Sequence, residues 1–198
     1  MLHPKASILA LATVTILLYA CAASNCPLES TVTCNYAFYD SEGTAVSYND
    51  YISVSTLLPG TKTVYIYKAL GHTTVTLDHQ DSSYIRNGFT ETVSTVRRDT
   101  TLINNLENGT GFKLPMSYFN DKDTLIISYS AISNKDTIIV SHDSYSFVEL
   151  PECGTQRFHT IKDVSCTESG LWGIEISNPK VNYDGNENIK LYFNGTAE

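Results

Sequence analysis

The chain has 198 residues, of which 13 are Lys or Arg and 21 are Asp or Glu, giving a formal net charge of −8. This acidic balance disfavours nucleic acid as a partner and supplies no polybasic patch for a membrane surface. The length suits one well-buried core rather than two large ones. Thr, Ser, Val, Ile and Tyr are frequent, and these residues fit pleated, half-buried surfaces.

The first 20 residues predict an export signal. Lys5 carries a positive charge, and residues 6–19 form an uncharged apolar run that is short for a membrane-spanning helix but suits a signal core. Residues 18–21, Leu-Tyr-Ala-Cys, resemble the lipobox of bacterial lipoproteins. That resemblance implies cleavage before Cys21 and attachment of several lipid chains to it, which would anchor the protein stably. An ordinary signal peptide, cut after Ala20 or Ala23, is the alternative.

The remaining chain predicts a lipidated tether over residues 21–30 and a single domain over residues 31–198. Its apolar alternation and frequent turn signals predict strands over residues 31–39, 52–57, 62–69, 73–77, 90–96, 100–106, 112–114, 124–130, 136–142, 145–150, 158–166, 171–177 and 188–193. Residues 70–99 are more polar, so the strands there are the least marked. No stretch of a dozen residues has a clear helical period. We therefore expect an all-β antiparallel β-sandwich, for which an immunoglobulin-like arrangement is one option.

Two similar segments, residues 123–127 and 136–140, predict a β-hairpin with its turn at residues 133–135. Each segment begins with Asp-Thr and an apolar residue. These triplets resemble the sites at which exported Bacteroidota proteins carry O-linked glycans, and both also fit as simple strand starts.

Five cysteines stand at positions 21, 26, 34, 153 and 166. If lipid occupies Cys21, four remain, and export places them where disulfides persist. Cys26, Cys34, Cys153 and Cys166 are therefore candidates for disulfides in any of three pairings. Free buried thiols and a metal site are the alternatives, and the spacing does not match a C-x2-C metal motif.

Catalytic signatures are missing from the sequence, which has no nucleophile elbow, no H-E-x-x-H and no Gly-rich phosphate loop. We therefore expect no enzyme, no catalytic residue, no cofactor and no metal. Residues 184–188 place oxygen-bearing side chains like the start of a calcium loop. However, Ile189 and Gly195 stand where such a loop has its Gly and its final Glu, which favours a polar turn.

Three tyrosines, Tyr65, Tyr67 and Tyr192, point away from the apolar residues of their expected strands. Such side chains suit a protein interface, where aromatic residues are enriched. They also suit stacking on sugar rings, or packing at sheet edges and under loops, and the sequence leaves these alternatives open.

Several stretches of the second half resemble an uncharacterised family of Bacteroidota outer-membrane lipoproteins. They are residues 102–106, 112–116, 152–154 with 158–161, and 181–185 with 188–193. The resemblance implies a small lipoprotein encoded beside an outer-membrane β-barrel protein, and an accessory subunit of the barrel assembly machinery of that phylum. It implies no catalytic residues.

These observations predict a non-enzymatic, lipid-anchored outer-membrane protein that docks on an integral outer-membrane β-barrel partner and its assembly complex. The resemblance favours the cell surface, although Glu29 is the first acidic residue after Cys21, which is the pattern of a periplasmic lipoprotein. A surface glycan-binding lipoprotein is the first alternative. A fimbrial or adhesin subunit is the second.

Overall fold

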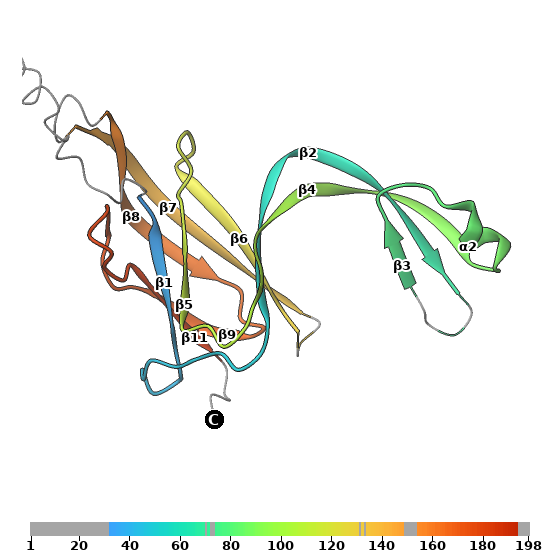
Figure 1. The fold of residues 1–198 in the computed structure, drawn as a ribbon, viewed down its shortest axis with the longest axis horizontal. Coiled ribbons are helices and arrows are strands. Elements are labelled where there is room, and N and C mark those ends of the chain that lie inside the picture. The colour runs from blue at the N-terminus through green and yellow to red at the C-terminus, as the bar shows by residue number, and fades with distance from the viewer. Residues whose placement is uncertain are drawn as a thin grey trace, which may run out of the picture.

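The computed structural model of the chain describes residues 32–69, 71, 74–130, 132, 134–148 and 154–193. Two β-sheets enclose one hydrophobic core, and a long ribbon projects from one of them (Figure 1). The expected all-β sandwich is confirmed. The predicted signal, tether, Cys21, Cys26 and Cys153 lie outside the described residues. Within the described residues, no helix has the length and apolar character that a membrane crossing requires.

The smaller sheet joins the two ends of the described chain. Its strand order is β5 (Gly111–Leu114), β1 (Cys34–Tyr39), β11 (Ile189–Phe193) and β9 (Leu171–Ile176). The pairs of β1 with β5 and of β11 with β9 are antiparallel, whereas β1 and β11 are parallel, with Phe38 opposite Leu191. The last strand in the sequence therefore lies in the middle of this sheet, beside the first.

The larger sheet carries the ribbon. Its order is β10 (Lys180–Val181), β8 (Gln156–Cys166), β7 (Lys135–Phe147), β6 (Lys122–Tyr129), β2 (Ile52–Lys68) and β3 (Thr74–Leu77), and β4 (Thr90–Leu106) pairs with β2. The predicted hairpin is confirmed in β6 and β7, where Asp123 lies opposite Val140. All pairs in this sheet are antiparallel.

The core follows from the two-residue period of the strands, because alternate side chains point to the same face. In β6 the inward side chains are Leu125, Ile127 and Tyr129, and each is less than a tenth exposed. Those of the facing sheet include Phe38 and Phe193, whose ring centroids lie 5.0 Å apart. This interleaving of the two sheets buries the apolar residues that the sequence distributes over many short segments.

Three pairs of predicted strands are in fact continuous. Residues 52–57 and 62–68 belong to β2, residues 90–96 and 100–106 to β4, and residues 136–142 and 145–147 to β7. The apparent turn at Pro59-Gly60 is a bulge, since Leu57 lies opposite Asp99 and Thr61 lies opposite Arg97. Gly60 has φ +86°, a conformation that glycine adopts without steric cost.

One short helix was not predicted from the sequence. α2 (Ser82–Arg86) begins after Asp81, whose carboxylate accepts a hydrogen bond from the Ser83 N–H at 2.9 Å. This is the usual capping interaction at a helix start. The helix lies at the outer end of the ribbon (Figure 1).

Candidate functional site

The projecting ribbon is the most unusual feature of the molecule. β2 pairs with β6 only over Ile52–Thr56, and beyond that point β2 and β4 leave the sandwich together (Figure 1). We define the arm as residues 57–101. Residues 57 and 68 of β2 lie opposite Asp99 and Thr90, so nine steps of β4 at about 3.3 Å each give the ribbon a length of roughly 30 Å. A two-stranded ribbon of this length exposes both faces and its outer edge to any partner.

The outer end of the arm has a small core of its own. Tyr67 is fully buried, and its ring stacks on that of Tyr84 with the centroids 4.8 Å apart. The Tyr67 hydroxyl donates to Glu91 at 2.8 Å and accepts from the Asp81 N–H at 2.7 Å. Phe89 meets the Tyr84 ring edge-on at 5.2 Å. These contacts fold β3 and α2 against the ribbon, so the arm has an ordered end that can present a surface.

Charge separates the arm from the body. The arm carries five of the 13 Lys and Arg residues and four of the 21 Asp and Glu residues, a net charge of +1 against −9 for the rest of the chain. Val93 and Val96 on the arm are 56% and 37% exposed. The arm therefore combines little net charge with uncovered apolar side chains, which favours contact with a protein surface.

A groove of about 630 Å³ lies where the arm meets the body. The arm contributes Leu57, Leu58, Pro59 and Arg97 to its lining, and β4 adds Leu102. The segment after β5 adds Pro115, Met116, Ser117 and Asn120. The hairpin of β6 and β7 adds Lys122, Asp123, Thr124, Leu125, Thr137 and Ile139. Leu102 and Ile139 are 41% and 38% exposed. Thr124 and Thr137, from the two Asp-Thr triplets, are half-buried in this lining. Its size is within the range of ligand sites, and most of its walls are apolar.

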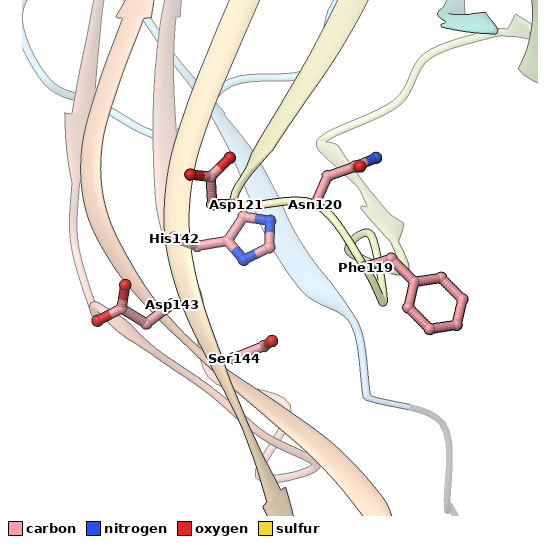
Figure 2. A pocket seen from close by; sticks show the side chains of 6 residues that line it. All are labelled: Phe119, Asn120, Asp121, His142, Asp143 and Ser144. Atoms are coloured by element: carbon pink, nitrogen blue, oxygen red, sulfur yellow. The ribbon is translucent and has the colours of Figure 1, made fainter. Parts of the chain in front are cut away.

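A second, smaller pocket of about 280 Å³ lies beside the turn before β6 (Figure 2). Its lining residues are Phe119, Asn120, Asp121, His142, Asp143 and Ser144. Phe119 is 91% exposed, and Figure 2 shows its ring turned away from His142. Its neighbour Tyr118 lies under the Arg157 guanidinium, 4.4 Å from the ring centroid to Cζ. This pocket is shallow, and its only deeply buried polar side chain is that of His142 among the lining residues.

The buried histidines form a chain of polar contacts across three strands. The Nδ1 atoms of His142 and His159 lie 3.2 Å apart, and His142 Nε2 lies 3.2 Å from Asp123 Oδ2. The second contact is poorly directed, so His142 Nε2 has no hydrogen-bond partner within the described part of the chain. Burial, together with nearby His142 and Arg157, lowers the pKa of His159 to about 4.

This chain of contacts does not have the geometry of a metal centre. His142 turns one ring nitrogen to His159 and the other to Asp123, so the three groups do not converge on one point. Within the described residues no group of three His, Cys, Asp or Glu side chains could hold a metal ion. The ring contacts instead join β6, β7 and β8 inside the body.

The three predicted interface tyrosines do not form one surface. Tyr65 is half-buried on the arm, and Tyr67 is buried in the outer end of the arm, so the Tyr67 ring is not available as a contact. Tyr192 lies on β11 in the other sheet, where its ring packs on Trp172 at 5.1 Å and on Tyr39 at 5.8 Å. The prediction rested on the two-residue alternation of a strand. Alternation predicts on which face of the sheet a side chain lies, but it does not predict what covers that face.

Cys34 and Cys166 are both free thiols in the structure, so neither forms a bridge there. Cys34 is fully buried in the core, and burial raises the pKa of its thiol to about 12. Cys166 ends β8 in the opposite sheet and is half-buried. Such different surroundings make Cys34 an inert core residue and Cys166 the more accessible thiol.

The turn at residues 184–188 is stabilised internally. Asp184 Oδ1 accepts from the Asn186 N–H at 2.9 Å, and Asn188 is buried. The Asn188 side chain accepts from the Asn35 N–H at 3.0 Å and donates to the carbonyls of Asn178 and Lys180 at 3.1 and 2.8 Å. These oxygen-bearing groups therefore serve the turn and its attachment to β1.

Asp136 is the buried carboxylate that sequence reasoning missed. It is 0% exposed and accepts five hydrogen bonds, from the Tyr129 and Thr167 hydroxyls and from the N–H groups of Ser169, Gly170 and Leu171. Burial alone would raise the pKa of Asp136, but these donors outweigh it and hold the pKa below its ordinary value. Asp136 thus fixes the β8–β9 connection to β7 as a structural anchor.

Comparison with known proteins gives one match. The sequence model of DUF6452, described as a family of unknown function, matches residues 90–193, from the start of β4 to the end of β11. Neither the curated proteins nor the solved structures gave a match. Because the matched residues make up more than half of the 198, the chain belongs to the DUF6452 family.

Proposed function

We propose that this protein is a non-enzymatic, lipid-anchored accessory subunit of the outer membrane, and that the arm docks it on an integral outer-membrane β-barrel partner. The observation that supports this most is the arm itself, which extends beyond the body and carries exposed Val93 and Val96. An element that extends from the body with exposed apolar side chains suits docking on a protein partner.

The groove at the base of the arm supplies the second contact surface. The arm lines this groove with Leu57, Leu58 and Pro59, and the body lines it with exposed Leu102 and Ile139, so a partner segment placed there would touch arm and body together. Contacts at two places along the arm would also set the orientation of the two proteins. The barrel assembly machinery as the complex, and the lipid at Cys21, follow from the sequence resemblances.

A lipid anchor would strengthen the association with the partner without adding any contact between the two proteins. Two proteins held in one membrane meet at a raised effective concentration, so an interface of modest area is sufficient. Without Lys5 of the predicted signal, the chain outside the arm has 7 Lys or Arg and 17 Asp or Glu, a net charge of −10, which favours contact with water over an anionic membrane surface.

The test is purification of the tagged full chain from its own membranes in mild detergent, with mass spectrometry of the proteins that accompany it. A matched variant lacks residues 61–97, which joins Gly60 to Arg98 and leaves Pro59-Gly60 as a two-residue turn. We expect a barrel protein and its assembly factors to accompany the intact chain in fixed proportion and to be lost from the variant. A folded variant that retains them, or an intact chain that purifies alone, contradicts the proposal.

One observation favours a second function, glycan binding. Trp172 is 41% exposed and packs on Tyr192, whose ring also contacts Tyr39, on the outer face of the smaller sheet. The Tyr192 hydroxyl donates to Glu175 at 2.6 Å, so a carboxylate lies beside the aromatic rings. Exposed rings with neighbouring acceptors suit stacking on sugars. Binding of the intact protein to a glycan array, lost in Trp172→Ala and kept in the arm deletion, would establish this function instead.

A further inference from the structure

No strand among the described residues pairs with the outer edge of β4. β4 pairs only with β2, and β2 has β6 on its other edge at one end and β3 at the other. Over residues 61–64 the sheet is therefore only two strands wide. Such a ribbon is marginally stable in water, and an unpaired strand edge is a template for another strand.

The hydrogen-bond pattern shows which residues of β4 face this edge. The Ser130 N–H donates to the Tyr51 carbonyl at 3.1 Å, so the Tyr51 backbone points toward β6. Alternation along β2 then turns the Thr56 backbone toward β4, where it lies opposite Thr100. Thr100 and the even-numbered residues of β4 down to Thr90 point inward, and the odd-numbered ones point outward.

The outward backbone groups are those of Glu91, Val93, Thr95 and Arg97. Proline is absent from this stretch, and residues 92–96 carry no charge. Charged residues and prolines are the usual protection of an edge strand. The only charges stand at its two ends, Glu91 toward the outer end of the arm and the Arg97-Arg98 pair toward the body.

We propose that the partner of this edge is a second copy of the same chain, paired antiparallel with Ser94 facing Ser94 of the second copy. In this register Glu91 of each copy lies opposite Arg97 of the other, which gives two cross-strand ion pairs. Val93 lies opposite Thr95 and Val96 opposite Thr92, so the two exposed valines are covered by β-branched neighbours.

The neighbouring register is disfavoured. Outward-facing residues must pair with outward-facing residues, so the next allowed register is reached by shifting one strand by two residues. This shift moves the axis of the pair from Ser94 to Thr95. With Thr95 on the axis, Glu91 would lie opposite Asp99, and like charges opposite each other destabilise a sheet. With Val93 on the axis instead, Glu91 would lie opposite Thr95 and Arg97 opposite Phe89, so both ion pairs would be lost.

Antiparallel arms also keep the acidic bodies apart. Thr101, at the base of the arm, lies seven positions after Ser94, a distance of roughly 23 Å at about 3.3 Å per position. The two bodies would stand roughly 45 Å apart, several times the Debye length of about 8 Å at physiological ionic strength. Repulsion between the two acidic bodies therefore does not oppose this dimer.

Cysteine cross-linking tests the register directly. Residues facing each other in a non-hydrogen-bonded pair have Cα atoms about 4.5 Å apart, which a disulfide can bridge. We expect the full chain with Ser94→Cys to form a disulfide-linked dimer at least ten times faster than the matched Thr95→Cys chain. Thr95 would lie diagonally from its copy, about 7–8 Å away. Equal rates, or faster linking by Thr95→Cys, would overturn the proposal.

A second measurement does not depend on added cysteines. Thr95→Pro removes an outward N–H without touching the ladder to β2, and edge strands accept proline at such positions. Sedimentation equilibrium should show the dimer dissociation constant raised at least ten-fold in Thr95→Pro and unchanged in Thr95→Val. The wild-type chain should dimerise as its concentration is raised to about 1 mM, which corresponds to the weakest dissociation constant expected here. If the chain stays monomeric up to that concentration, the pairing is refuted, whereas docking on a barrel partner is unaffected.

Discussion

Replacing Asp136 by Asn keeps the shape of the side chain and removes its charge. Oδ2 of Asp136 accepts from Tyr129 Oη at 2.7 Å, Gly170 N at 2.6 Å and Leu171 N at 2.9 Å. Oδ1 accepts from Thr167 Oγ1 at 2.9 Å and Ser169 N at 2.7 Å. In Asn, an amide nitrogen replaces one of the two carboxylate oxygens. At the Oδ1 position the nitrogen disturbs two accepted hydrogen bonds, whereas at the Oδ2 position it would disturb three.

The magnitude follows from the donors that remain. With nitrogen at the Oδ1 position, the Thr167 hydroxyl can rotate to accept, but the Ser169 N–H faces another donor, which costs about 1–3 kcal/mol. Three further bonds change from charged to neutral, and each loses about 0.5–1 kcal/mol. We therefore expect Asp136→Asn to lower the free energy of unfolding by about 3–5 kcal/mol.

Urea unfolding at pH 7, followed by circular dichroism, measures this loss. Thr167→Val is the matched control, since it removes one donor to the carboxylate and should cost about 1–2 kcal/mol. Asp136 has a folded-state pKa below its ordinary value, so its contribution is present above the unfolded-state pKa and is lost as pH falls through the folded one. The variant should lack that acid-labile part. A loss below about 1 kcal/mol in Asp136→Asn would refute the anchor role.

Other predictions concern the body of the protein. His159 has a folded-state pKa of about 4 against 6.5 ordinarily, so stability should fall by roughly 3 kcal/mol as pH drops from 6.5 to 4, and a His159→Gln chain should show a flatter curve in thermal melts across that range. Gly111→Ala would place a Cβ 2.2 Å from the Tyr36 carbonyl oxygen and should separate β5 from β1, visible as a melting temperature lowered by more than about 5 °C. Native iodoacetamide labelling at pH 8, read by mass spectrometry, should modify Cys166 and leave Cys34 unmodified until the chain is unfolded; equal labelling would contradict the burial of Cys34.

Sequence patterns were sufficient for the sandwich but not for the arm. Alternation in residues 124–130 and 188–193 marks strands with one buried face, and these became β6 and β11. Pro59-Gly60 has the composition of a hairpin turn, so the sequence favoured two short strands over one long one. Only the pairing of Leu57 with Asp99 and of Thr61 with Arg97 reveals that the chain continues through a bulge.

The polar groups inside the body could not be located from spacing. His142 and His159 are 17 positions apart, and they meet because β7 and β8 are neighbours with a bulge after Ser141. Asp136 looked like an ordinary strand start in the sequence. Its five donors come from two separate segments, Tyr129 and residues 167–171, and a local pattern carries no signal of such a convergence.

The place of β11 has a consequence for how the protein is made. β11 ends at Phe193 yet lies between β1 and β9, so the smaller sheet remains incomplete until the chain has been made as far as Phe193. A shorter nascent chain would therefore hold an open core, with Phe38 and Leu191 unable to meet. Folding dominated by contacts between distant residues is slow. The order of strands thus delays closure of the smaller sheet until β11 has been made.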